Sequence, residues 1–369
     1  MHSNLDFGSK VFFGKNSVEK NKARLLALGK SCLIVTSKSG AKKSGALADV
    51  VNALSSMNIE YCVFDKITEN PLVSTVIEGG KAAREFGAEF VIGIGGGSPL
   101  DASKAVAICA LNPEYDIEGL YGRNVPSKAL PVVLVGTTAG TGSEVTGVSV
   151  LTNDKTMMKK SIGGADCYAS LVFADPKYTY SMNFDVTAST ALDAYAHAVE
   201  GWFSKRCNDE ARDYARKAFP LIFKGLRFMA ETGEIPEEAL RDEMFYGALY
   251  AGMELNICGA GFPHTVGYVL TENFGIPHGK ACTAFADYFM KKAKANESDR
   301  YTELLKILDC TEAELLDVIN KLTDVKGLNI TEEQADEWCS RWKNITMKNF
   351  DNSPGGLTVD EAKEALLSL

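Results

Sequence analysis

The sequence has 369 residues, of which 46% are hydrophobic and 24% are charged. This composition is typical of a globular protein of one large domain or two, and it excludes disordered, fibrous and coiled-coil classes. The net charge of −9 argues against nucleic acids and anionic membranes as partners.

Short β-branched runs alternate with helical patterns through the first half of the chain. Apolar runs predict strands, and stripes at helical spacing predict helices. Because the two alternate, we expect an α/β domain with a parallel sheet whose strands are buried on both faces. The predicted strands are 31–36, 61–64, 89–95 and 130–136, and the predicted helices are 47–57, 71–86 and 98–111.

Beyond Asp175-Pro176 the strand pattern is absent and helical patterns continue to the end. We expect an all-helical second domain, with domain ranges of 1–178 and 179–369. Its first helices are predicted at 186–204, 208–232 and 236–255. Three capping boxes, which mark helix starts, are predicted at Thr311/Glu314, Thr331/Gln334 and Thr358/Glu361.

The membrane and redox context can also be read from composition. The longest clear apolar stretch, 129–136, is too short to cross a bilayer, and the N-terminal segment lacks the apolar core of a signal peptide. The nine cysteines form no C-x-x-C pair. We therefore expect reduced thiols and a cytoplasmic location.

Two glycine-rich loops follow predicted strands. The first, GIGGGSPLD at 93–101, opens a helix, and a helix N-terminus with adjacent glycines can bind a pyrophosphate. It departs from G-x-G-x-x-G because Ser98 stands in the last position. The second, TTAGTGSE at 137–144, offers four hydroxyls. Two such loops at neighbouring strand ends favour a nucleotide lying across the sheet edge.

Three of the four histidines suggest a metal site. His197 follows Asp193 by four residues, so both side chains share one helix face. His264 and His278 would lie about 21 Å apart on a straight helix, whereas ligands of one ion lie within about 4 Å. The chain should therefore turn back at 275–277. One aspartate with three histidines suits Fe²⁺ or Zn²⁺ better than Ca²⁺ or Mg²⁺.

These segments together resemble the iron-containing (group III) alcohol dehydrogenase family. The resemblance rests on GGGSPLDASK at 95–104, TTAGTGSEVT at 137–146, DAYAHAVEGW at 193–202 and the two Pro-His segments. It implies a dinucleotide-binding domain, a helical metal-binding and substrate domain, and one metal in the cleft between them. It also implies that the metal ligands are Asp193, His197, His264 and His278.

The resemblance further implies cofactor residues and a reaction. Gly96, Gly97 and Ser98 would hold the pyrophosphate, and Lys159 or Lys160 would reach the nucleotide. The nicotinamide side would be lined by Asp101, Thr137, Thr138, Thr141 and Ser143. The reaction would be hydride transfer between NAD(P)H and a small aldehyde or primary alcohol, with the metal as a Lewis acid. A homodimer is also expected from the family.

Two positions depart from the family pattern. Tyr268 replaces a histidine that many members carry four residues after the third ligand. Tyr268 is our candidate for the proton relay, and water is the alternative. Ser37 stands where NAD-preferring members often carry an aspartate that repels a 2′-phosphate. With Ser37 and Ser39 beside the ribose and lysines nearby, we predict that NADP(H) is favoured over NAD(H). If Lys38, Lys42 and Lys43 only belong to a solvent-exposed loop and bind no phosphate, we expect both cofactors to work.

The sequence is also compatible with other functions. A glycerol dehydrogenase-like polyol dehydrogenase would share the fold and would usually prefer zinc. A sugar-phosphate cyclase-type lyase, such as dehydroquinate synthase, needs several basic side chains on a substrate phosphate, whereas Lys280 is the one basic residue in 264–280. A non-catalytic nucleotide-binding or metal-sensing protein would keep the glycine loops. The sequence alone identifies neither the substrate nor the metal ion.

Overall fold

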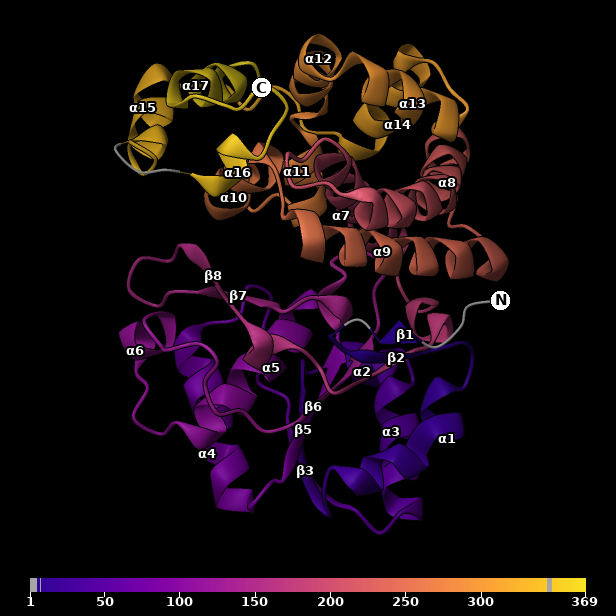
Figure 1. The fold of residues 1–369 in the computed structure, drawn as a ribbon, viewed down its shortest axis with the longest axis vertical. Helices are drawn as coiled ribbons and strands as arrows, with labels where there is room; N and C mark the ends of the chain where they lie inside the picture. Colours follow the sequence, from indigo (N-terminus) through magenta and orange to yellow (C-terminus); the bar gives the residue numbers. More distant parts are fainter. Residues whose placement is uncertain (1–4, 7, 344–346) are drawn as a thin grey trace. The chain divides into compact units, whose positions relative to one another are not determined.

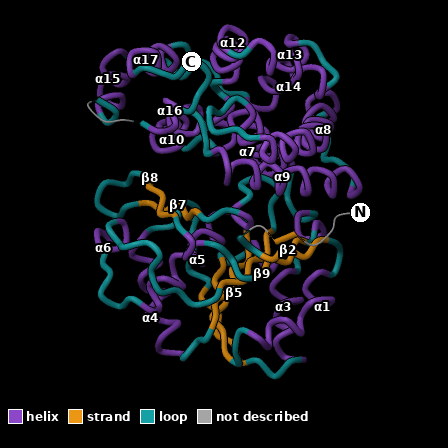
Figure 2. The backbone as a smooth tube through the Cα atoms, in the orientation of Figure 1, coloured by secondary structure: helices purple, strands orange, loops and turns teal. Residues whose placement is uncertain are grey.

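The computed structural model describes residues 5–6, 8–343 and 347–369. The fourth histidine, His2, which has no predicted role, lies outside the described part. The chain divides into two compact units, Met1–Met182 and Asn183–Leu369, whereas the sequence placed the change between residues 178 and 179. Figure 2 shows the strands in orange within the first unit and helices in purple throughout the second.

The first unit is built on a seven-stranded sheet. Six strands are parallel and β1 pairs antiparallel with β2. All four predicted strands are present, but the patterns at β2 and β9 were not recognised as strands. In sheet order the strands are β1 (Leu5–Asp6), β2 (Lys10–Phe13), β9 (Leu171–Ala174), β6 (Val132–Gly136), β5 (Phe90–Gly95), β3 (Ser31–Thr36) and β4 (Glu60–Phe64).

Helices and a small ribbon complete this unit (Figure 1). The three predicted helices are confirmed as α3, α4 and α5, while the antiparallel β7–β8 ribbon was not predicted. The bounds are α1 (Ser17–Asn21), α2 (Gly40–Lys43), α3 (Ala46–Ser56), α4 (Val73–Phe86), α5 (Gly97–Leu111), α6 (Ile117–Tyr121), β7 (Val148–Thr152) and β8 (Lys159–Gly163).

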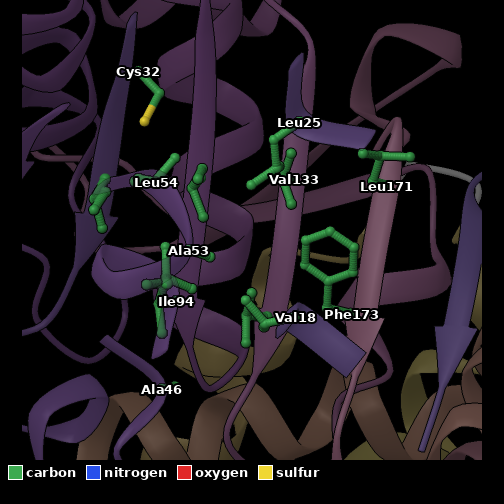
Figure 3. Packing of buried hydrophobic residues seen from close by; sticks show 14 of the residues in the cluster. Val18, Leu25, Cys32, Ala46, Ala53, Leu54, Ile94, Val133, Leu171 and Phe173 are labelled. Atoms are coloured by element: carbon green, nitrogen blue, oxygen red, sulfur yellow. The ribbon is translucent and has the colours of Figure 1, made fainter. Parts of the chain in front are cut away.

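A hydrophobic core fixes the sheet against its helices. Figure 3 shows Ile94, Val133 and Phe173 of three neighbouring strands beside Val18 of α1 and Ala53 of α3. All five are buried. Because burial of such side chains is the main driving force for folding, this core holds the carboxyl ends of β3, β5 and β6 at one edge of the sheet.

The second unit contains helices and no strand among its described residues, as predicted. All three predicted capping boxes are confirmed. The described part of the chain holds no helix with both the length and the apolar content for a membrane crossing. The helices are α7 (Phe184–Trp202), α8 (Asp209–Thr232), α9 (Glu238–Cys258), α10 (Phe262–Phe274), α11 (His278–Thr283), α12 (Ala286–Asn296), α13 (Ser298–Leu308), α14 (Glu312–Thr323), α15 (Glu332–Ser340), α16 (Lys348–Asp351) and α17 (Val359–Leu367).

Candidate metal centre and nucleotide loops

Helix α7 supplies two side chains of the candidate metal centre. The helix starts where the Asn183 side chain accepts a hydrogen bond from the Val186 amide, a common N-cap. Asp193 and His197 then lie one turn apart on the same face, and both are buried. The Asp193 Oδ1 atom is 3.8 Å from His197 Nε2. The four-residue spacing thus brings a carboxylate and an imidazole together.

The predicted turn between the other two histidines is confirmed. Helix α10, which carries His264, ends at Gly275 with φ of 66°, and α11 begins at His278. The left-handed conformation suits glycine and ends the helix. The two imidazole rings consequently lie 5.3 Å apart, centroid to centroid. From Asp193 Oδ1, the Nε2 atoms of His264 and His278 are at 3.4 and 3.8 Å.

Two glycines permit this close approach of three helices. A Cβ atom at Gly279 would collide with the Ser189 carbonyl and the Asp193 amide of α7. A Cβ atom at Gly267 of α10 would lie 3.0 Å from the Ala281 carbonyl oxygen of α11. The residue next to His278 therefore has to be very small for α11 to reach α7.

The donor set fits a divalent transition-metal ion. Ligands bound at about 2.1 Å lie about 3 to 3.5 Å apart, close to the distances from Asp193. Within the described residues, Asp193 Oδ1 and His264 Nε2 are buried and make no hydrogen bond. Buried polar atoms rarely remain unsatisfied, so the two atoms that face one another have the arrangement expected of ligands.

The sequence reasoning assigned no role to Glu200, which supports this centre. Glu200 Oε1 lies 2.7 Å from His264 Nδ1, and its Oε2 accepts a hydrogen bond of 2.6 Å from the Gly261 amide. A carboxylate at Nδ1 fixes the imidazole tautomer and turns Nε2 toward the metal. The sequence signal that could have identified Glu200 is its position seven residues after Asp193, about two turns further along the same helix.

Tyr268 and Cys282 also lie beside the histidines. The Tyr268 ring stacks on His278 with centroids 5.3 Å apart. Cys282 Sγ is 3.7 Å from His278 Nδ1, and it groups with Asp193, His264 and His278 as candidate ligands. Tyr268 therefore lies beside a candidate metal ligand, and its part in a proton relay stays a prediction. The sulfur of Cys282 is an additional donor close to the centre.

The electrostatics of the centre favour positive charge. Burial opposes ionisation of Asp193, but His197, His264 and His278 outweigh it and lower its pKa. Burial likewise opposes protonation of His264, whereas Cys282, Glu200 and Asp193 raise its pKa well above the ordinary value. The acidic side chains around His264 therefore stabilise positive charge at the centre, as binding of a cation requires.

In the first unit, the two glycine-rich loops lie against each other. Helix α5 begins at Gly97 with Gly96 as its N-cap. A Cβ atom on Gly96 would lie 3.0 Å from Thr138, and one on Gly97 would lie 2.6 Å from Thr141. The backbone of the first loop therefore packs on the hydroxyl-rich second loop. The Ser98 hydroxyl accepts a hydrogen bond of 3.3 Å from the Asn70 amide.

Asp101 and Ser143 bond to one another. The Ser143 hydroxyl donates to Asp101 Oδ1 at 2.6 Å, and Lys104 Nζ donates to Ser143 Oγ at 3.0 Å. Lys104 is fully buried and its Nζ also donates to the carbonyls of Thr146 and Val148. This network joins α5 to the second loop, and the sequence reasoning missed Lys104. Burial raises the pKa of nearby Glu144 to about 7.

The remaining predicted cofactor residues are spread over the first unit. Ser37 follows β3, and Ser39 occupies the N-cap position of α2 without a capping hydrogen bond from its side chain. Thr137 follows β6, and its amide donates to the Gly95 carbonyl at 2.8 Å. Lys160 lies in β8, with its Nζ 4.7 Å from the centroid of the Tyr121 ring.

The chain matches two family models over most of its length. Residues 8–176 match the model described as iron-containing alcohol dehydrogenase, and residues 187–337 match the C-terminal domain of the same family. Among curated proteins, 1,3-propanediol dehydrogenase of Citrobacter freundii is 36% identical over 73% of this chain and 70% of its own length. NADPH-dependent butanol dehydrogenase of Clostridium saccharobutylicum is 29% identical over 86% and 81%.

Solved structures agree with these matches. An iron-containing alcohol dehydrogenase from Thermotoga maritima superposes with a TM-score of 0.89 at 33% identity, covering 98% of both chains. Sulfoacetaldehyde reductase from Bifidobacterium kashiwanohense, solved with NAD⁺, gives 0.84 at 31% identity over 99% and 97%. With family models covering both halves, this chain belongs to the iron-containing alcohol dehydrogenase family and is an NAD(P)-linked, metal-binding oxidoreductase.

Proposed function

We propose that this enzyme reduces small aldehydes to primary alcohols with NADPH, using Fe²⁺ held by Asp193, His197, His264 and His278. The observation that supports the proposal most is the arrangement of three imidazoles around one buried carboxylate oxygen, at 3.4 to 3.8 Å. Zinc in place of iron is the alternative, because this donor set accepts both ions.

The protein groups around the ion have separate tasks in the proposed mechanism. A divalent ion bound there would act as a Lewis acid toward the aldehyde oxygen. The carboxylate of Asp193 would offset part of the ion's charge, and Glu200 would orient His264 by accepting a hydrogen bond from its Nδ1–H group. The alcohol oxygen gains a proton after hydride transfer, and we assign the delivery of that proton from solvent to the Tyr268 hydroxyl.

The cofactor assignment rests on the first unit. Backbone amides of Gly96, Gly97 and Ser98 at the start of α5 are suited to a pyrophosphate. The neighbouring hydroxyls of Thr137, Thr138 and Thr141 are suited to the nicotinamide half, with Asp101 and Ser143 holding the second loop in place. We also propose that Lys160 contacts the nucleotide.

The NADPH preference rests on the loop after β3. Ser37 brings no carboxylate, and Lys38 and Lys43 are exposed there. Lys42 lies 3.7 Å from Asp65, so part of its charge is already offset. Relatives do not decide the matter, since one is named for NADPH and another was solved with NAD⁺.

The substrate class follows from the names of the relatives. They are named for 1,3-propanediol, sulfoacetaldehyde, butanol and lactaldehyde, which are small aldehydes or their alcohols. We propose short linear aldehydes as substrates. The homodimer and the cytoplasmic location stay predictions of the sequence.

The test is a nucleotide-oxidation assay of the iron-loaded enzyme with butyraldehyde. We expect activity that is lost with a chelator and regained with Fe²⁺, and a higher kcat/KM with NADPH than with NADH. A strong NADH preference would contradict the cofactor proposal. Inactivity with both nucleotides across aldehydes and diols would contradict the function itself.

A matched substitution separates the cofactor proposal from the rest. Ser37→Asp places a carboxylate beside the ribose, where it repels a 2′-phosphate and can bind the ribose diol. We expect kcat/KM for NADPH to fall at least about tenfold relative to that for NADH, equivalent to about 1.4 kcal/mol. Ser31→Ala, at the opposite end of β3, is the control and should leave the ratio unchanged.

A further inference from the structure

A second group of metal-binding side chains lies in the helical unit. It consists of Cys207, Glu254 and Cys258, whose two Sγ atoms and one carboxylate oxygen lie within 4.8 Å of one another. Glu254 and Cys258 are one turn apart at the end of α9, and Cys207 immediately precedes the N-cap of α8. Cys207 is 9% exposed, and the other two are fully buried. None of them belongs to the Asp193 centre.

In the described part of the chain, Glu254 has no partner that explains its burial. Both of its carboxylate oxygens are buried and make no hydrogen bond within the described residues. Its carboxylate fills the space above Gly201 of α7, where an added Cβ atom would lie 2.8 Å from Glu254 Cδ. An isolated buried carboxylate is very unfavourable, so this group requires either a proton or a cation.

The backbone around the two thiols is held in place independently of them. The Cys258 carbonyl accepts hydrogen bonds from Asn352 Nδ2 at 3.0 Å and from Ser204 Oγ at 3.2 Å. Arg206 Nη2 donates to the Ile257 carbonyl at 3.0 Å. The segment before α8 and the end of α9 are therefore fastened together, which keeps the two sulfur atoms close.

We propose that Cys207, Glu254 and Cys258 form a second, structural metal site for a thiophilic divalent cation of the zinc class. Two thiolates and a carboxylate are ligands of zinc, at about 2.3 Å for sulfur and about 2.0 Å for oxygen. Tetrahedral ligands at these lengths lie about 3.5 to 3.8 Å apart, so small side-chain movements close the cluster around one ion. The thiol and carboxyl protons pass to solvent on binding.

Two observations favour this cation over the alternatives. Sulfur ligands disfavour Mg²⁺ and Ca²⁺, which bind oxygen. A Cys207–Cys258 disulfide would leave Glu254 buried without a partner, whereas a cation satisfies all three groups. A hydrogen bond from Cys258 and the charge of Arg300 lower the pKa of Cys207, which eases its conversion to a thiolate. The same hydrogen bond and burial raise the pKa of Cys258, so the ion itself has to displace the second thiol proton.

The test measures cobalt binding to the full chain, purified under reducing conditions and stripped of metal. We expect about two Co²⁺ ions per chain and a thiolate-to-cobalt charge-transfer band. Cys207→Ser and Glu254→Gln should each weaken binding of the second ion, and Cys207→Ser should reduce the band strongly, because Cys258 is then the one thiolate ligand left in the cluster. Asp193→Ala should remove the other ion and keep the band. Cys339→Ser, a buried cysteine of α15, is the matched control and should keep both ions.

Several results would overturn the proposal. Wild-type protein that binds a single ion, or a band lost with Asp193→Ala or Cys282→Ser instead of Cys207→Ser, assigns all metal binding to the Asp193 centre. A Cys207–Cys258 disulfide found by mass spectrometry in protein purified without reductant, together with a single ion after reduction, replaces the metal site by a redox pair. If Cys207→Ser does not fold, the wild type and Asp193→Ala decide, because both retain the three proposed ligands.

Discussion

The Glu200 carboxylate serves two donors at once, and this makes its substitution informative. Its oxygens accept from His264 Nδ1 and from the Gly261 amide. Glu200→Gln replaces one acceptor by a donor, so one of the two hydrogen bonds is lost and the other is made to a neutral oxygen, which holds His264 less firmly. We expect iron affinity to fall by about 10- to 100-fold, measured by competition with a chelator.

A second glutamate provides the control for this prediction. Glu272 lies on α10, the helix that carries His264, and accepts a hydrogen bond of 2.8 Å from Arg341. Glu272→Gln should leave iron affinity within error of the wild type. Equal losses in the two variants would show that Glu200 acts through general stability and not through His264.

A buried ion pair in the first unit predicts an acid-sensitive contribution to stability. Arg123 Nε and Nη2 donate to the two oxygens of Asp166 at 3.2 and 3.1 Å, and both side chains are buried. Burial opposes ionisation of Asp166, but Arg123 and the Ser127 amide lower its pKa below 3.8. The pair therefore contributes fully above pH 3.8, and its contribution is lost as the pH falls through the lowered pKa.

Arg123→Ala should leave Asp166 buried without its partner. We expect the free energy of unfolding at pH 7 to fall by about 3–5 kcal/mol, measured by urea denaturation. The loss should shrink at acidic pH, where Asp166 is protonated. The double variant Arg123→Ala/Asp166→Ala should recover part of the loss, and a loss independent of pH would contradict the role of the ion pair.

At the scale of helices, the approach of α11 to α7 depends on Gly279. A methyl group there meets the backbone of Ser189 and Asp193, which cannot move aside as a flexible side chain can. Gly279→Ala should push His278 away from Asp193 and reduce bound iron at least about tenfold, as measured by elemental analysis. Gly163→Ala in β8 is the control, because the added Cβ would come no closer than 3.3 Å to its nearest neighbour, the Gly147 carbonyl oxygen. Unchanged iron content would show that α11 adapts.

Local patterns explain which elements could be predicted. Strands such as β3 and β5 are continuous apolar runs, which a strand prediction recognises. The two candidate ligands on α7 are four residues apart, and this spacing places both side chains on one face of a helix. The strands β2 and β9 are four residues each and depend on pairing between Lys10 and Leu171. Pairing over such a distance leaves little local signal.

The same reasoning applies to the site. The turn between His264 and His278 was predictable because Gly275 and Pro277 disfavour a continuous helix. Glu200 was missed because its partner is 64 residues away, and Lys104 because the oxygens that accept its hydrogen bonds lie outside α5. Contacts that form only after the chain has folded cannot be read from the spacing of residues.

At the scale of the whole molecule, each ligand should stabilise the unit that binds it. Ligand binding stabilises a fold by about 2.7 kcal/mol at a hundredfold excess over Kd, and the proposed iron and nucleotide ligands belong to different units. In hydrogen exchange, iron should protect amides of α7, α10 and α11, and NADPH should protect the start of α5 and the loop after β6. In Asp193→Ala, protection by iron should be lost and protection by NADPH retained. If iron protected only the strands of the first unit, the ligand assignment to Asp193, His197, His264 and His278 would be wrong, because amides nearest a bound ion open less often when it is present.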